Sequence, residues 1–198
     1  MGKVVGLILA GGRSSRFGSD KALARLGGRP LLQVVAQRLE SQVDRLVVSG
    51  ESNSCLSIDA AYLSDPIPDR GPLGGILAGL DWLYQNDIDR LVSVSVDTPF
   101  FPEDLVARLV QASNADEAVI CRQGGQLHPS VGLWPVALRP FLRQAIARQA
   151  MSMTRFAQVT AGARICDFDD AAAHAFLNIN TRDDLALAER IYAAEARP

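Results

Sequence analysis

The stretch that most constrains this chain lies near its start. An apolar run, VVGLI at residues 4–8, leads directly into residues 9–21, which read LAGGRSSRFGSDK. A β-branched run followed by glycines and basic residues is typical of an α/β sheet, in which such a loop presents backbone N–H groups at the carboxyl end of a strand. Because those groups bind phosphate, we predict a nucleotide site directly after the first strand.

The spacing of this loop excludes two common phosphate-binding motifs. The Walker motif needs contiguous Gly-Lys-Ser/Thr, whereas two residues separate Gly18 from Lys21. The dinucleotide fingerprint G-x-G-x-x-G also fails, because Gly11 and Gly12 are adjacent and the next glycine is Gly18. Adjacent glycines let successive N–H groups face one anion, so a third kind of phosphate loop remains.

Basic residues in the same loop supply charge for a triphosphate. Arg13, Arg16 and Lys21 are three cations within nine residues. The alternative is a strand-to-helix turn whose glycines serve geometry only and whose basic side chains are solvated. Lys21, however, opens the apolar segment ALARL at residues 22–26 and so lies beside core-forming residues. That position favours the nucleotide site.

Length and composition limit the classes of protein that the chain can represent. The 198 residues suit a single α/β domain, residues 1–198, with a core that needs no disulfides. A net charge of −2 argues against a nucleic-acid-binding face, and three cysteines without a C-x-x-C pair argue against a disulfide framework or structural zinc. The apolar run at 4–8 is too short for a signal peptide or membrane span. We expect a monomeric cytoplasmic protein.

Alternation of strand and helix patterns indicates the fold class. The expected strands are 4–8, 45–50, 60–63, 90–97 and 164–168, and the expected helices are 30–39, 75–84, 102–113, 136–147, 152–159 and one starting at Thr181. Residues 118–122 and 127–134 are expected to be strands joined by a Gly-Gly hairpin. We predict an α/β, three-layer, Rossmann-like, mostly parallel sheet with helices on both faces and a small antiparallel hairpin insertion.

Asp97 is the strongest single candidate for chemistry. It ends the clearest strand, residues 90–97, and open α/β sheets bind ligands at the carboxyl ends of their strands. Its alternative role is an Asx turn or a cap for the helix at 102–113. A carboxylate beside a polyphosphate is a hard oxygen ligand for Mg²⁺, so we predict Asp97 as the metal ligand. The acidic cluster Asp167, Asp169 and Asp170 is instead expected to be a solvated loop.

Further motifs follow in a fixed order along the chain. They are Leu-Ala-Gly-Gly at 9–12, Ser-Arg-Phe-Gly at 15–18, Asp-Lys at 20–21, Gly-Arg-Pro-Leu-Leu at 28–32, Gly-Pro-Leu-Gly-Gly-Ile at 71–76, Asp-Thr-Pro at 97–99, His-Pro at 128–129 and Asn-Ile-Asn-Thr at 178–181. The ordered set resembles the nucleotidyltransferases of the GT-A-like fold, and particularly the molybdenum cofactor guanylyltransferases of the MobA type. The resemblance extends from Val4 to about Leu187.

The resemblance implies a reaction and a set of site residues. GTP would donate GMP to the phosphate of molybdopterin with release of pyrophosphate, assisted by Mg²⁺ on Asp97 and by Arg16 and Lys21. The nucleotide site would comprise Leu9, Ala10, Gly11, Gly12, Lys21, Ser49, Asp65 and Asp97, and the acceptor site would comprise Gly74, Gly75, Asn178 and Asn180. The antiparallel hairpin would lie on the acceptor side, and no chemical role is assigned to His128.

The resemblance also leaves alternatives. Ser49 stands where relatives often have Asn, and Gly74 replaces the more usual Ala. Gly12 favours guanine, because the related cytidylyltransferases usually carry Leu-Ala-Ala-Gly. The alternatives are a cytidylyltransferase or a sugar-1-phosphate nucleotidyltransferase of the same fold, and a non-catalytic nucleotide-binding module. The pair Asp97 and Lys21 argues against the last, because a pure binder does not need it.

Overall fold

A computed structural model describes most of the chain. It covers residues 2–11, 21–50, 58–67, 70–114, 116–148 and 152–195. The predictions on Gly12, Arg13 and Arg16 lie outside the described residues, as does the prediction on the side chain of Lys21.

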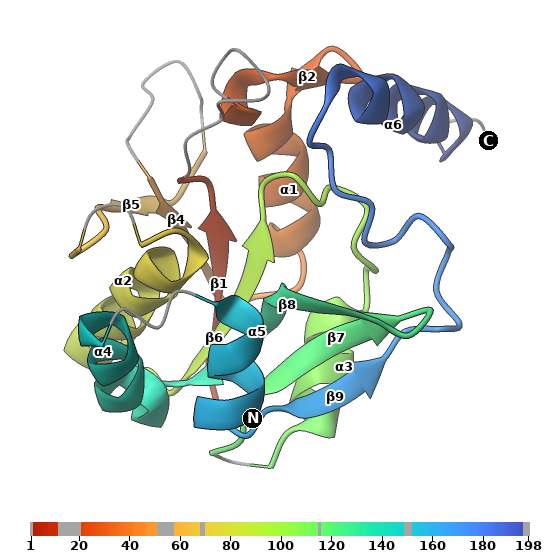
Figure 1. Ribbon diagram of the computed structural model, residues 1–198. Helices are drawn as coiled ribbons and strands as arrows, with labels where there is room; N and C mark the ends of the chain where they lie inside the picture. The colour runs from red at the N-terminus through yellow and green to blue at the C-terminus, as the bar shows by residue number, and fades with distance from the viewer. Residues whose placement is uncertain are drawn as a thin grey trace.

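The described residues form a seven-stranded central sheet in the order β5-β4-β1-β6-β8-β7-β9 (Figure 1). Its strands are β1 (Val4–Leu9), β4 (Arg45–Ser49), β5 (Ala61–Leu63), β6 (Arg90–Ser95), β7 (Val119–Gln123), β8 (Gln126–Pro135) and β9 (Arg164–Asp167). Strand β8 runs antiparallel to β6 and β7, and the other neighbouring pairs are parallel. The predicted mostly parallel α/β sheet is confirmed.

Helices cover both faces of this sheet. They are α1 (Leu31–Glu40), α2 (Pro72–Gln85), α3 (Leu105–Ala112), α4 (Arg139–Ala147), α5 (Met153–Arg155), which continues as the π-helical turn Phe156–Thr160, and α6 (Arg182–Glu195). Short 3₁₀ turns occupy Lys21–Leu23 and Val136–Leu138. Helices α1 and α3 pack on one face, and α2 and α4 pack on the other.

The two faces bury separate apolar cores because β1 alternates its side chains between them. Val4 and Ile8 join the core beneath α1 and α3, whereas Val5, Leu7 and Leu9 join the core beneath α2 and α4. A strand with apolar residues on both faces is typical of a sheet buried between two helical layers. The predicted three-layer arrangement is therefore confirmed.

The structure differs from the prediction in several places, among them the start of α3 at Leu105 and the end of β6 at Ser95. The hairpin of β7 and β8 forms as expected but belongs to the central sheet. A second, two-stranded antiparallel sheet pairs β2 (Arg25–Leu26) with β3 (Arg29–Pro30) through Gly27 and Gly28, both at positive φ. Helix α2 begins at Pro72, three residues earlier than expected, because proline suits the first helical turn.

The direction of the strand order reverses around β1. From β1 the chain crosses through α1 to β4 on one side, and it returns as β6 on the other side of β1. The arrowheads of β1 and β6 point to the same edge of the sheet (Figure 1). Ligands of open α/β sheets bind where the strand order reverses, so the end of β1 and Asp97 after β6 lie at the expected edge.

Replacing Gly79 by alanine should destabilise the protein. A Cβ atom there would lie 2.7 Å from Leu91 Cδ2 and 3.1 Å from Leu7 Cδ2, so these fully buried side chains or α2 would have to shift. We expect a loss of about 1 to 2 kcal/mol in the free energy of unfolding, measured by urea denaturation, despite the better helix propensity of alanine. Gln85→Ala, at the exposed end of the same helix, is the matched control. A more stable Gly79→Ala variant would contradict this packing.

Candidate active site

The first turn of α2 lies directly against the ends of β1 and β4. A Cβ atom at Gly75 would lie 2.6 Å from Ser49 Oγ and 2.7 Å from Leu9 Cδ2. Real Cβ atoms do not approach other atoms so closely, so only glycine permits this contact. The structure therefore places Gly75, which was predicted on the acceptor side, against Leu9 and Ser49, which were predicted in the nucleotide site.

A buried serine and a half-buried carboxylate extend this group. Ser49 is 2% exposed, and its hydroxyl donates a hydrogen bond to Asp65 Oδ1 at 2.9 Å. The second carboxylate oxygen, Asp65 Oδ2, lies 3.1 Å from where a Cβ atom of Gly74 would be. Burial raises the pKa of Asp65, and the hydrogen bond from Ser49 opposes that rise. The carboxylate is thus held between the end of β4 and the start of α2.

The backbone at the end of β1 is fixed by both neighbouring strands. Ala10 N donates to Ser49 O at 3.0 Å, and Val96 N donates to Leu9 O at 3.1 Å. Ala10 is half-buried and Gly11 is exposed, so the chain emerges from the sheet at this point. The predicted nucleotide residues of β1 therefore lie beside Ser49, at the start of the glycine-rich loop.

Asp97 lies in the turn that follows β6, two residues beyond the last residue of the strand. Its carbonyl oxygen accepts a hydrogen bond from Ile179 N at 2.8 Å. The neighbouring Thr98 hydroxyl donates to Asn178 Oδ1 at 2.8 Å and lies 3.4 Å from Asp97 Oδ1. The structure thereby joins the predicted metal ligand to the predicted acceptor segment. Thr98, which connects them, was part of the Asp-Thr-Pro motif but was not singled out as a site residue.

The alternative role of Asp97 as a helix cap is wrong. Helix α3 begins at Leu105, and Asp104 occupies its N-cap position. The helix predicted to start at Thr181 is confirmed, and a capping box begins it: Asp184 N donates to Thr181 Oγ1 at 3.1 Å, while Asp184 Oδ2 accepts from Thr181 N at 2.8 Å. Asp184 Oδ2 also accepts from Asn180 N at 2.9 Å, which fixes the backbone of this exposed residue.

A cavity of about 680 Å³ adjoins Asn178. It lies between the β7–β8 hairpin and the segment that leads to α6, and it is lined by Gln123, Gly124, Gln126, His128, Asp169, Ala171, Ala173, Phe176, Leu177 and Asn178. The His128 ring stacks on Phe176 with centroids 4.7 Å apart and planes 20° apart. Burial lowers the pKa of His128, which favours the neutral imidazole.

The acidic cluster is paired with arginines and is not simply solvated. Arg122 bonds both carboxylate oxygens of Asp167, at 2.5 and 2.7 Å, which lowers the pKa of Asp167. Arg108 bonds both oxygens of Asp170. Asp169 Oδ1 accepts from the backbone N of the hairpin glycine at 2.7 Å. These contacts tie the segment after β9 to its neighbours, so the cluster has a structural role.

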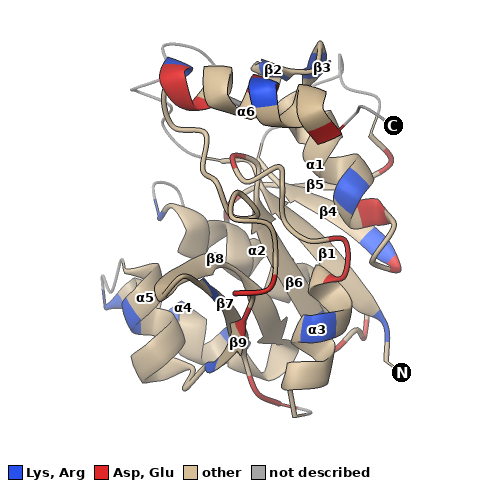
Figure 2. Cartoon of the chain, turned by 90° about the vertical axis from the view of Figure 1, so that its right-hand side faces the viewer, with Lys and Arg blue, Asp and Glu red and all other residues tan. Residues whose placement is uncertain are grey.

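Charged side chains of both signs lie on the surface of the described residues. On the face shown in Figure 2, Lys and Arg are interleaved with Asp and Glu over helices and loops. No helix within the described ranges is long and apolar enough to cross a membrane. In the same part of the chain, no group of three or more His, Cys, Asp and Glu side chains could hold a metal ion.

Comparison with known proteins identifies the family. The protein-family model described as a MobA-like NTP transferase domain matches residues 6–162 of the sequence. The chain belongs to the MobA-like NTP transferase family. A molybdenum cofactor guanylyltransferase of Cereibacter sphaeroides is 43% identical over 197 residues, covering 98% of this chain and 100% of the relative. One from Bradyrhizobium sp. is 40% identical over 205 residues, covering 98% and 95%.

Solved structures share the fold of this MobA-like chain. Molybdopterin-guanine dinucleotide biosynthesis protein A from Archaeoglobus fulgidus aligns with a TM-score of 0.76 and 20% identity, covering 96% of this chain and 99% of that one. A nucleotidyl transferase from Methanothermobacter thermautotroptrophicus aligns with a TM-score of 0.79 and 17% identity, covering 98% and 99%. At these identities the likeness concerns the fold alone.

The predicted site residues that the structure describes fall into two groups at one edge of the sheet. One group comprises Leu9, Ala10, Gly11, Ser49, Asp65, Gly74 and Gly75. The other comprises Asp97, Asn178 and Asn180. Gly74 and Gly75, predicted on the acceptor side, lie against Ser49 and Asp65, so their role toward the acceptor stays a prediction. Gln126 and Phe176 were missed, because their place beside Asn178 depends on tertiary packing.

Replacing Ser49 by alanine should raise the pKa of Asp65 further, because the hydroxyl stabilises the ionised carboxylate. NMR titration of the Asp65 carboxyl carbon measures this shift. In the folded protein the pKa of Asp65 lies above its ordinary value of 3.8. The free energy of unfolding should therefore fall as the pH rises from 3.8 to the folded-state pKa, and Ser49→Ala should make this fall larger.

Asp65→Asn, which removes the titrating group, is the control for this pH dependence. An unchanged or lower pKa of Asp65 in the Ser49→Ala protein would contradict the conclusion that the hydrogen bond from Ser49 lowers this pKa.

Proposed function

We propose that this chain transfers GMP from GTP to the phosphate of molybdopterin, releasing pyrophosphate and forming molybdopterin guanine dinucleotide. The observation that carries this proposal is the identity of 40 to 43%, over nearly the whole chain, with relatives named molybdenum cofactor guanylyltransferase. Grouping of the candidate residues at one sheet edge supports it, because transfer requires a nucleotide and an acceptor close together.

The first group of residues would hold the nucleotide. Backbone groups from Leu9 to Gly11 would contact the base, together with Gly12 from the loop outside the described residues. Asp65, a carboxylate held by Ser49 at 2.9 Å, is a hydrogen-bond acceptor. A carboxylate suits a partner that offers N–H or O–H donors, such as guanine or ribose.

Asp97 would hold Mg²⁺ beside the phosphates. The residues present fit a hard cation, because the half-buried Asp97 carboxylate lies 3.4 Å from the Thr98 hydroxyl, which in turn donates to Asn178 Oδ1. When bound, the metal would neutralise charge on the phosphate oxygens. Arg16 and Lys21 would stabilise the negative charge that develops on the leaving pyrophosphate.

The acceptor would attack without a general base. A phosphate monoester has a second pKa of about 6 and is therefore largely dianionic at neutral pH. What the chain must supply is alignment of that oxygen with the α-phosphorus, opposite the leaving group. Asn178 and Asn180, fixed by Thr98 and by the capping box of α6, would position the acceptor.

The cell compartment forms part of the proposal. We place the enzyme in the cytoplasm, where thiols stay reduced. Two described cysteines support this location, because Cys121 and Cys166 are free thiols on adjacent strands. Burial raises the pKa of each thiol, which keeps it protonated and unreactive.

A competition assay tests the proposed function. Molybdopterin, Mg²⁺ and equal amounts of the four nucleoside triphosphates are mixed with the enzyme, and each dinucleotide product is quantified. We expect use of GTP over CTP by a factor of about 100 or more, because a site built for specific hydrogen bonds rejects the wrong base strongly. A control with EDTA should give no product.

Comparable use of CTP would overturn the choice of guanine and support the cytidylyltransferase alternative. Absence of any product with molybdopterin, together with pyrophosphate release from a sugar phosphate, would overturn the proposed acceptor.

A further inference from the structure

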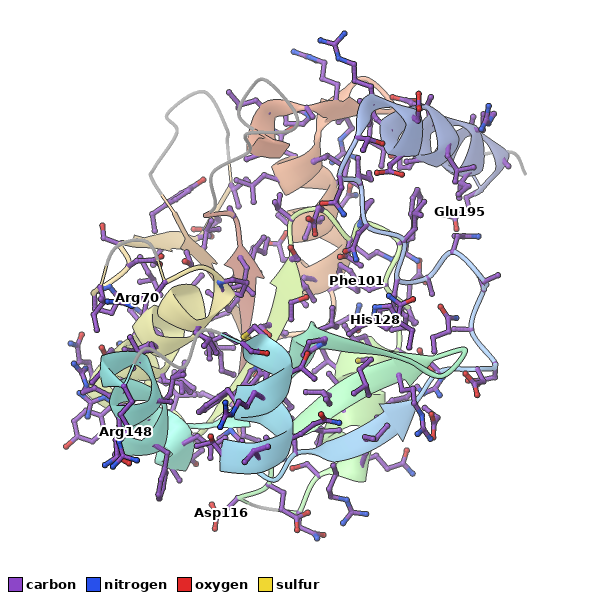
Figure 3. The ribbon with its side chains drawn as sticks, in the orientation of Figure 1. Arg70, Phe101, Asp116, His128, Arg148 and Glu195 are labelled. Carbon is purple, nitrogen blue, oxygen red and sulfur yellow. The ribbon has the colours of Figure 1, made fainter. Side chains whose placement is uncertain are left out.

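The side chain of His128 lines the cavity beside Asn178. His128 lies near the start of β8, close to the turn that joins β7 to β8, and is labelled in Figure 3. Its ring is half-buried, whereas its stacking partner Phe176 is 3% exposed. Phe176 is in turn backed by Phe168, with centroids 5.4 Å apart and planes at 75°. The imidazole is therefore the more accessible member of a rigid aromatic stack.

Such a stack is suited to a flat ligand. A neutral ring held in place by other aromatic rings offers a planar surface at little entropic cost. Because burial lowers the pKa of His128, the imidazole is uncharged at neutral pH and carries no preference for an anion. The expected ligand at this surface is a neutral planar heterocycle.

Polar groups on the cavity walls can form hydrogen bonds with the edge of that heterocycle. Gln126 is exposed on the hairpin, and its amide is both a donor and an acceptor. Asp169 uses Oδ1 to accept from Gly124 N, and a carboxylate has capacity for further N–H donors. Gln123 is held by backbone oxygens of residues 168 and 172, so the wall is fixed. Amide and carboxylate groups together match a pyrimidinone edge that carries an amino group.

Hydrogen bonds link one wall of the cavity to the turn that carries the predicted metal ligand. Asn178 lines it and accepts from the Thr98 hydroxyl, and the next residue, Ile179, donates its N–H to Asp97 O. A ligand with a ring at one end and a phosphate at the other therefore suits a site that has the cavity at one end and Asp97 at the other.

We propose that this cavity binds the pterin ring of the acceptor, with His128 as the stacking residue that determines acceptor specificity. The inference rests on the proposed function, in which the acceptor is molybdopterin. It adds a binding site for the ring to a reaction that otherwise involves only the acceptor's phosphate.

A binding experiment with a simple pterin tests the cavity alone. Neopterin, which is fluorescent, is titrated with the full chain, and its anisotropy is followed for the wild type, His128→Ala and His128→Phe. We expect about tenfold weaker binding for His128→Ala, in the range of base–aromatic stacking, and near-normal binding for His128→Phe, which keeps a ring. His174→Ala is the matched control, because that histidine contacts Phe100 and Glu195.

Steady-state kinetics separate this inference from the proposed function. His128→Ala should raise the KM for molybdopterin about tenfold while leaving the KM for GTP unchanged, because only the ring contact is lost. Gln126→Ala, on the exposed wall, should raise the same KM and serves if His128→Ala does not fold, which circular dichroism reports.

Each outcome decides one of the two proposals. Normal neopterin binding and a normal acceptor KM in His128→Ala, or absence of neopterin binding to the wild type, would overturn the cavity as the pterin site. If the wild type binds neopterin through His128 but makes no dinucleotide from any triphosphate, the proposed transfer fails while the binding site stands.

Discussion

Two hydrogen bonds between the turn after β6 and the segment before α6 hold the site together. Asp97 O accepts from Ile179 N, and the Thr98 hydroxyl donates to Asn178 Oδ1, both at 2.8 Å. Ile179 is fully buried, so the two exposed asparagines on either side of it are held at the surface beside Asp97. Without these bonds the predicted acceptor segment would have no fixed position relative to Asp97, the predicted metal ligand.

The nucleotide half depends on a different constraint, the close approach of α2 to the sheet. Gly75 allows the first turn of α2 to contact Ser49 and Leu9, and that contact encloses the Asp65 carboxylate. Because β1 lies between β4 and β6, the two halves flank the same strand end. The doubly wound strand order therefore explains why residues so far apart in sequence form one site.

Sequence reasoning predicted the parts of this arrangement that depend on local pattern. Periodicity gave the central strands, and the position of Asp97 after a buried strand led to its choice as a ligand. Pairing of Asn178 with Thr98, and of His128 with Phe176, depends on packing between distant segments and leaves no local signal. The β2–β3 hairpin was missed although Gly27 and Gly28 carried its turn signal, since both adopt positive φ there. The site roles of Gly12 and Arg16 stay predictions, because both residues lie outside the described ranges.

The central claim is that Asp97 holds the metal between a nucleotide half and an acceptor half. Anomalous diffraction from crystals grown with Mn²⁺ and a non-hydrolysable GTP analogue tests it most directly. The account predicts a manganese peak at the Asp97 carboxylate, with the analogue's base beside Ser49 and Asp65. A peak at the Asp167 and Asp170 cluster, or a nucleotide bound in the cavity lined by His128, would contradict it.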